Sequence, residues 1–170
     1  MIMTSAIVRP ALASDEPFLW TMLFEASHAA EQQMEVDDLR SVPELARYVE
    51  KWGGAGDLGV IGCEEGGTML GAAWIRLFDA RNAAYGYVDD RTPELAVGVV
   101  PRARGTGLGT MMLNRLLDSA AADHDAVCLS VRENNPARRL YERLGFVYVP
   151  GSEKTNRVGT TSITMVRRLG

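Results

Sequence analysis

The chain has 170 residues, of which 46% are apolar and 24% charged, so it suits one domain over residues 1–170 with a single core. The net charge of −4 at pH 7 argues against a nucleic-acid partner, because such proteins carry clustered Lys and Arg. No apolar run reaches the roughly 20 residues of a membrane-spanning helix, and residues 1–5 lack the start of a secretory signal, so we expect a cytoplasmic protein with no membrane partner.

The first half of the chain predicts a strand, two helices and a β-hairpin. The predicted ranges are a strand at 6–9, helices at 14–26 and 41–52, and strands at 58–63 and 69–78. Ser14 is the expected cap of the first helix, and Ser41-Val42-Pro43-Glu44 has the Ser-x-x-Glu pattern of a capping box for the second. Glu64-Glu65-Gly66-Gly67 is typical of a hairpin turn. The acidic stretch at 31–38 is expected to be an exposed turn or helix end.

The second half alternates strands and helices. The predicted ranges are a loop at 79–90 with room for a short strand at 85–88, strands at 94–100 and 127–131, helices at 107–121 and 136–144, and strands at 146–149 and 162–166. The strand at 94–100 is apolar apart from Glu94, which suits a buried central strand. Asn135 is the expected cap of the last helix, and Gly145 its stop. The sequence therefore predicts a mixed α/β domain.

The connection between the strand at 94–100 and the following helix contains the most informative functional motif of the sequence. Arg104-Gly105-Thr106-Gly107-Leu108-Gly109 has three alternating glycines, which let backbone N–H groups approach a ligand closely. A helix N-terminus also has unpaired N–H groups and a positive dipole end, and both favour phosphate. Arg104 adds a cation that can hold a diphosphate with two donors, and the hydroxyls of Thr106 and Thr110 are further candidate donors. We expect an anion site here.

Three alternative assignments of this loop fit its residues less well. A plain glycine-rich connection is the simplest alternative, but an arginine followed by three alternating glycines favours a binding site. No Lys-Ser or Lys-Thr follows Gly109, so this is not a Walker loop. The position three after Gly107 is Thr110, which departs from the dinucleotide fingerprint. Nucleotide hydrolysis and hydride transfer are therefore disfavoured.

The cysteines and histidines give no sign of a metal centre. Cys63 and Cys128 lie in apolar, strand-like runs, where free thiols act as small hydrophobic side chains. His28 and His124 have no cysteine close in sequence, unlike the ligand pairs of zinc sites. No metal is expected.

Two motifs together resemble a known family. The run Val99-x-Pro101-x-x-Arg104-Gly105-x-Gly107-x-Gly109 resembles the acetyl-CoA signature of the GCN5-related N-acetyltransferases (GNAT). Farther on, Leu129-Ser130-Val131-x-x-Asn134-x-x-Ala137-x-x-x-Tyr141-x-x-x-Gly145-Phe146 resembles the second motif of that family. Both occur in the family's order, and the order of predicted elements also matches, although the resemblance is sharp only from Pro93 to Phe146.

The resemblance implies a fold and a donor site. The fold would be a mixed, mostly antiparallel sheet flanked by helices, in which the parallel strands four and five splay apart to admit acetyl-CoA. The pantetheine arm would bond to strand four, the diphosphate would rest on the loop, and Asn134 would bond the pantetheine. The implied CoA-binding residues are Val97, Val99, Arg104, Gly105, Thr106, Gly107, Leu108, Gly109, Thr110 and Asn134. Relatives are often dimers, so a homodimer is one assembly to test.

The resemblance also implies a reaction, namely transfer of an acyl group, foremost acetyl, from its CoA thioester to a primary amine of a small molecule or peptide. No cysteine occupies a motif position, so direct attack in a ternary complex is expected, with strand-four N–H groups polarising the thioester carbonyl. Tyr141 matches the residue that protonates the departing thiolate; a phenol with a pKa of about 10 is a stronger acid than water. Glu94 is a candidate general base, or alternatively a sheet-edge carboxylate that bonds to backbone.

Acceptor contacts and competing functions complete the expectations. The N-terminal helices and the loop at 79–90 are the candidate acceptor contacts, and Trp74 and Tyr87 could line the acceptor slot, although Trp74 also fits a core position. A non-catalytic acyl-CoA-binding or sensor domain on the same scaffold is the main alternative function. A phosphate- or nucleotide-binding module unrelated to acyl transfer is a third, which the second motif disfavours.

Overall fold

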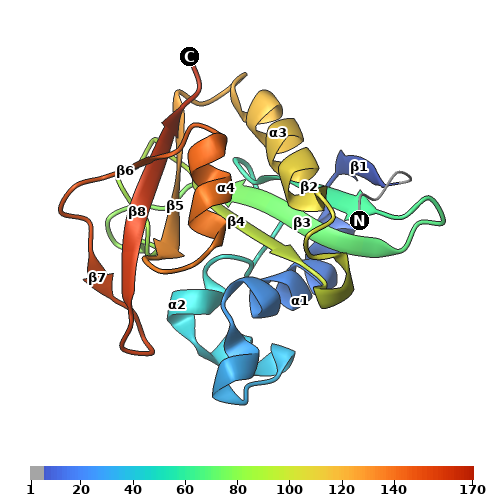
Figure 1. Cartoon of the computed structure of the whole chain (residues 1–170), viewed down its shortest axis with the longest axis horizontal. Coiled ribbons are helices and arrows are strands. Elements are labelled where there is room, and N and C mark those ends of the chain that lie inside the picture. Colours follow the sequence, from blue (N-terminus) through green and yellow to red (C-terminus); the bar gives the residue numbers. More distant parts are fainter. Residues whose placement is uncertain (1–5) are drawn as a thin grey trace. The chain divides into compact units, whose positions relative to one another are not determined.

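The computed structural model describes residues 6–170, so residues 1–5, on which the expectation of no secretory signal rests, lie outside the described part. The strands are β1 (Ile7–Pro10), β2 (Leu58–Cys63), β3 (Met69–Arg76), β4 (Glu94–Val99), β5 (Ala126–Arg132), β6 (Val147–Tyr148), β7 (Lys154–Thr155) and β8 (Thr161–Arg168). The α-helices are α1 (Glu16–Ala26), α2 (Pro43–Ala46), α3 (Leu108–Ala120) and α4 (Ala137–Arg143) (Figure 1). The 3₁₀ helices are η1 (Ala13–Asp15), η2 (Ala29–Gln32), η3 (Val36–Ser41) and η4 (Pro101–Ala103).

The strands form one hydrogen-bonded order, β1-β2-β3-β4-β5-β8-β6, with β7 paired to β8. The pairs of β1 with β2, β2 with β3, and β8 with β5, β6 and β7 are antiparallel. β4 and β5 are parallel, with Glu94 opposite Cys128. The predicted mixed α/β fold, mostly antiparallel with one parallel pair, is confirmed.

Two compact units make up the chain. The first contains the residues up to Ile75 together with Ala96–Ser119, and the second contains Arg76–Leu95 with Ala120–Gly170. A single domain over the whole chain stays a prediction. Among residues 6–170, no helix combines the length and the apolar character that crossing a membrane would require.

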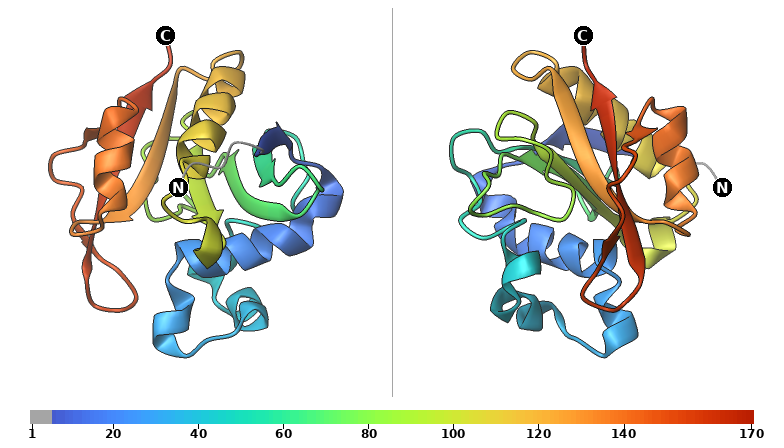
Figure 2. Two further views of the ribbon diagram at one scale, coloured as in Figure 1. Left: turned by 45° about the vertical axis from the view of Figure 1, so that its right-hand side comes forward. Right: turned by 90° about the vertical axis from the view of Figure 1, so that its left-hand side faces the viewer.

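In the first unit, α1 and α3 pack on opposite faces of the strands (Figure 2, left). A Cβ on Gly71 of β3 would lie 2.8 Å from Val99 Cγ1 and 2.9 Å from Met112 of α3, so these residues share one face. A Cβ on Gly98 would lie 2.4 Å from the carbonyl oxygen of Met22, so the backbone of α1 touches the other face of β4. Because adjacent residues of a strand point to opposite faces, the two contacts are consistent.

In the second unit, the long strand β8 pairs along β5 from Ala126 to Arg132, and α4 lies beside them (Figure 2, right). The predicted cap of α4 is confirmed, because Asn135 Oδ1 accepts the N–H of Ala137 at 2.9 Å. Gly145 follows the helix with φ 92°, as expected of a C-terminal glycine. No strand forms at 85–88, where the chain makes turns.

Two predicted helix starts are wrong. α1 begins after η1, and the side chain at its start is Asp15 instead of Ser14: Asp15 Oδ2 accepts the N–H of Leu12 at 2.7 Å. Both Asp15 oxygens also bond to the Arg9 guanidinium, at 2.8 and 2.9 Å. A carboxylate paired with a guanidinium is the stronger hydrogen-bond partner, which a serine hydroxyl does not match.

The capping box predicted at 41–44 does not form. Ser41 ends η3, no side chain caps the start of α2 at Val42, and α2 has only four residues before the chain continues in turns. The apolar face predicted for this segment is nevertheless correct: its members are buried, namely Leu45, Tyr48, Val49 and Trp52. The burial of these four side chains therefore does not require a regular helix.

Candidate active site

The glycine loop lies between β4 and α3 in the first unit. Gly105 and Gly107 have φ angles of 72° and 88°, in the left-handed region that favours glycine. No atom lies within 4 Å of the position that a Cβ would take on either residue. The loop therefore needs glycine for its backbone conformation, and the side of the backbone that a side chain would occupy is open.

Backbone donors gather at the same place. α3 begins at Leu108, and the first N–H groups of a helix have no acceptor within it. The N–H of Met111 bonds to the carbonyl of Gly107 at 3.1 Å, which closes the first turn. The side chain of Leu108 is buried, so this residue offers only its N–H group. An open glycine backbone at a helix start fits the phosphates of CoA.

The side chains of the loop are already engaged. Thr106 is buried, and its hydroxyl donates to the carbonyl of Ala103 at 2.6 Å, so that proton holds the loop. Arg104 Nη2 donates to Glu25 Oε1 at 2.9 Å. Arg102, on η4, bonds to Glu64 at 2.7 Å. The Arg104 and Thr106 contacts hold the loop itself, whereas the Arg102 pair lies just before it. Thr110 is exposed at the start of α3.

The partner of Arg104 could not be found from sequence. Glu25 lies 79 positions away on α1. No local pattern relates residues so distant, and Glu25 stands near the end of a mostly apolar helix whose other acid is Glu16, in the first turn.

Val97 and Val99 present their backbone groups to one edge of β4. The N–H of Val100 donates to the carbonyl of Leu70 at 2.8 Å, so Val100 faces β3. Successive residues of a strand direct their N–H and C=O groups to opposite edges. Val97 and Val99 therefore direct theirs away from β3, the orientation that an added extended chain such as pantetheine requires.

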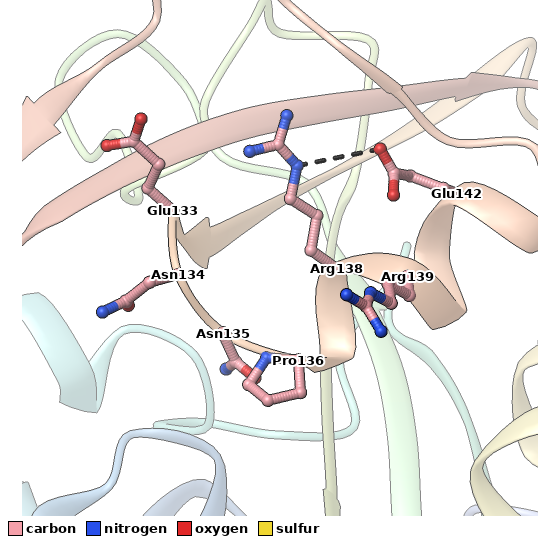
Figure 3. Close-up of a pocket in the computed structure, with 7 residues that line it drawn as sticks. All are labelled: Glu133, Asn134, Asn135, Pro136, Arg138, Arg139 and Glu142. Carbon is pink, nitrogen blue, oxygen red and sulfur yellow. Dashed lines mark ion pairs between the residues drawn. The ribbon is translucent and has the colours of Figure 1, made fainter.

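In the second unit, Asn134 lies on the loop between β5 and α4. It lines a hollow of about 480 Å³ together with residues of the first turns of α4. Figure 3 shows the side chain of Asn134 directed away from the helix, and Arg138 directed toward Glu142, with which it pairs at 3.8 Å. Asn135, its neighbour, is occupied in capping the helix. Asn134 is thus the amide that is exposed.

Tyr141 lies on α4, half-buried, with its ring edge-on to Phe146 at a centroid distance of 6.0 Å. Its hydroxyl has no hydrogen-bond partner among residues 6–170. Burial raises the pKa of Tyr141 to about 12. The phenol therefore keeps its proton at neutral pH.

Glu94 is 2% exposed, and one of its carboxylate oxygens accepts the N–H of Gly86 at 3.0 Å. A Cβ on Gly86 would lie 2.7 Å from the backbone of Leu129, so the loop at 79–90 is held tightly onto β5. This is the backbone-bonding role that the sequence left open for Glu94. Opposite it, burial raises the pKa of the Cys128 thiol, with the charge of Glu94 as a second cause. A general-base role for Glu94 stays a prediction.

The two candidate acceptor residues, Trp74 and Tyr87, lie in different environments. Trp74 is fully buried and donates its indole N–H to the carbonyl of Tyr48 at 2.8 Å, so it belongs to the core. The hydroxyl of Tyr87 donates to Asp90, which raises the pKa of Tyr87 to about 12. No cluster of three or more His, Cys, Asp or Glu that could hold a metal occurs within residues 6–170.

Sequence comparison places the chain among acetyltransferases. The profile of the acetyltransferase (GNAT) family matches residues 20–146. A mycothiol acetyltransferase from Beutenbergia cavernae is 35% identical over 127 residues, which cover 73% of this chain and 38% of that protein. One from Thermobispora bispora is 33% identical over 123 residues, covering 71% of this chain and 38% of that protein. The chain thus spans less than two fifths of the length of these curated relatives.

Solved structures agree in fold. A phosphinothricin acetyltransferase from Sinorhizobium meliloti, in complex with acetyl-CoA, has a TM-score of 0.69 at 21% identity, covering 98% of this chain and 90% of that chain. The yncA protein of Salmonella typhimurium, with its cofactor acetyl-CoA, has a TM-score of 0.66 at 22% identity, covering 98% and 95%. At these identities the likeness is one of fold. Together with the family match over residues 20–146, it supports one conclusion: the chain belongs to the acetyltransferase (GNAT) family.

Proposed function

We propose that this chain transfers an acetyl group from acetyl-CoA to a primary amine of a small molecule or peptide. The observation that carries the proposal is the glycine loop at the start of α3, whose left-handed Gly105 and Gly107 leave the ligand side of the backbone open. Family membership supplies the class of reaction. The loop supplies the reason to assign a CoA donor to this chain's own residues.

Donor binding uses backbone more than side chains in this proposal. The N–H groups from Arg104 to Thr110 hold the diphosphate, with Gly109 and Leu108 in the first turn of α3. The backbone of Val97 and Val99 bonds to the pantetheine arm as an added strand would. Asn134, exposed on its loop, contributes a side-chain amide to the same arm.

The reaction proceeds by direct attack of the neutral amine on the thioester carbonyl. The nitrogen–carbon bond forms, the carbon–sulfur bond breaks, and the CoA sulfur leaves as a thiolate. Tyr141 gives the thiolate its phenolic proton and regains one from solvent. The N–H groups of β4 stabilise the carbonyl oxygen as it gains charge. The proton lost by the ammonium substrate goes to Glu94 directly or through water.

The names of the relatives guide the choice of acceptor class. A mycothiol acetyltransferase, a phosphinothricin acetyltransferase and, among the fold neighbours, a spermidine/spermine N-acetyltransferase from Vibrio cholerae all carry the names of small molecules. We therefore place small-molecule amines ahead of peptides. A test panel contains phosphinothricin, spermidine and a lysine peptide.

The experiment combines binding with turnover. Isothermal titration with acetyl-CoA and with ATP separates a CoA site from a general nucleotide site; we expect binding of acetyl-CoA alone. Release of free thiol is then measured across the amine panel. Tight acetyl-CoA binding with no thiol release for any amine would favour the non-catalytic sensor domain instead. No acetyl-CoA binding would remove the proposal altogether.

The two roles of Glu94 are separated by Glu94→Gln. A general base predicts a large loss of kcat at neutral pH and a changed ascending limb of the pH–rate profile. A purely structural carboxylate predicts lower stability, because the bond to Gly86 weakens, with an unaltered profile. We expect the base signature, and an unchanged profile would withdraw Glu94 from the mechanism.

A further inference from the structure

The ion pair between Arg104 and Glu25 joins the glycine loop to α1. Arg104 Nη2 and Glu25 Oε1 are 2.9 Å apart, a charge-assisted hydrogen bond. The Arg104 side chain is 57% exposed and that of Glu25 only 19% exposed. The carboxylate is thus the shielded partner and the guanidinium the accessible one, with its outer donors free of this bond.

Glu25 lies on α1, which is packed firmly within the first unit. α1 is packed onto the first unit through fully buried Leu19 and Met22. The carbonyl of Met22 lies against the backbone of Gly98 on β4, and β4 leads directly into the glycine loop. The carboxylate that holds Arg104 is therefore fixed to the same strand that ends at the loop.

The donor count of arginine allows a second partner. A guanidinium has five N–H donors in a planar fork, and the bond to Glu25 uses one of them. The remaining donors can still form bonds to a diphosphate. A mobile arginine side chain loses rotamer entropy when it becomes ordered on binding. A side chain that is ordered before the ligand arrives does not incur that cost on binding.

We infer that Glu25 is a positioning residue for the acyl-CoA donor: it holds the Arg104 guanidinium at the mouth of the glycine loop in a binding-ready orientation. The inference rests on the proposed function, because it assigns the diphosphate of CoA as the ligand of Arg104. Glu25 itself does not touch the donor. Its negative charge is neutralised by Arg104, so the pair presents hydrogen-bond donors at little cost in repulsion.

The test measures CoA affinity by isothermal titration. Glu25→Ala leaves Arg104 without its anchor and weakens CoA binding about fivefold. Glu25→Gln keeps an oxygen acceptor at the same distance and retains affinity within about twofold of the wild type. In turnover, Glu25→Ala raises the KM for acetyl-CoA and leaves kcat unchanged. The thermal midpoint of each variant verifies that it is folded.

Two controls isolate the guanidinium. Glu64→Ala removes the other ion pair of this region, that of Arg102, and leaves CoA affinity unchanged, since Arg102 lies outside the glycine loop. In an Arg104→Ala background, Glu25→Ala has no further effect, because the side chain through which it acts is gone.

The results that would contradict the role of Glu25 differ from the result that would contradict the proposed function. Equal or tighter CoA binding by Glu25→Ala overturns the inference, as does an equal loss in Glu64→Ala or an undiminished effect in the Arg104→Ala background. Each of these leaves the proposed function standing. If the wild-type chain does not bind CoA, both the proposed function and the inference about Glu25 are refuted.

Discussion

Gly105 and Gly107 are left-handed residues with open space where a side chain would stand. An alanine at 107 meets no neighbouring atom, yet its backbone is strained by about 1–2 kcal/mol in this conformation. We expect Gly107→Ala to weaken acetyl-CoA binding at least about tenfold, because relaxation of φ redirects the N–H groups of the loop and the new methyl group occupies the ligand's side.

Isothermal titration measures the affinity, and Gly159→Ala is the matched control. Gly159 has φ 84° and an equally open Cβ position, in a turn near β8. It should lose similar stability with no change in affinity. Equal affinity in the two variants would contradict a phosphate site at Gly107.

Tyr141 has a half-buried phenol whose pKa is raised to about 12 by burial. For Tyr141→Phe we predict a fall in kcat of about 10²-fold or more with unchanged CoA affinity, since only the proton donor is lost. The phenol stays protonated until pH approaches its folded pKa, so the wild-type rate should show no Tyr141-dependent loss between pH 7 and pH 10 in a stopped-time thiol-release assay. Tyr148→Phe, on β6, is the control. Unchanged turnover in Tyr141→Phe would refute the acid role.

At the scale of elements, the contact of α1 with β4 depends on one glycine. A Cβ at Gly98 would lie 2.4 Å from the carbonyl oxygen of Met22, closer than packed atoms approach. Because this is backbone against backbone, the helix must shift away from the strand.

We expect Gly98→Ala to lower the free energy of unfolding by about 1–3 kcal/mol, measured by urea denaturation. Gly66→Ala is the control: this glycine lies in the hairpin turn with nothing near its Cβ position, and the cost there should stay below about 0.5 kcal/mol. If the two variants were equally stable, α1 would not be packed as described.

At the scale of the whole molecule, the Arg9–Asp15 pair makes stability depend on pH. The hydrogen bonds from Arg9 are the main cause that lowers the pKa of Asp15 below its usual 3.8. A carboxyl with a lowered folded pKa stabilises the fold fully above its unfolded pKa, about 3.9. That contribution is lost as the pH falls through the folded value.

Asp15→Asn should therefore cost about 1–3 kcal/mol of unfolding free energy at pH 7 and little at pH 2, by urea denaturation at each pH. Asp118→Asn, at an exposed position on α3, should cost little at either pH. A loss that is the same at both pH values would mean that charge is not the source of the stabilisation.

Local patterns were enough for much of the fold and for part of the site. The strand 58–63, the hairpin turn after it, the helix following the glycine loop and the Asn135 cap all depend on neighbours a few residues away. The glycine loop was predictable for the same reason, since alternating glycines before a helix permit the left-handed backbone that the loop adopts. The assignments of Tyr141 and Asn134 came from motif resemblance and stay predictions.

The sequence by itself determined the mixed α/β class, through periodicity, and the family and the position of the glycine loop, through short-range motifs. The single parallel strand pair was expected only from the family resemblance. Only the tertiary structure decided that α1 begins after Asp15 and is not capped by Ser14, that Trp74 is core, that Glu94 bonds to Gly86 and that Glu25 holds Arg104. The last three depend on partners 26, 8 and 79 positions away. Competition among distant hydrogen-bond partners is settled only when the chain is packed.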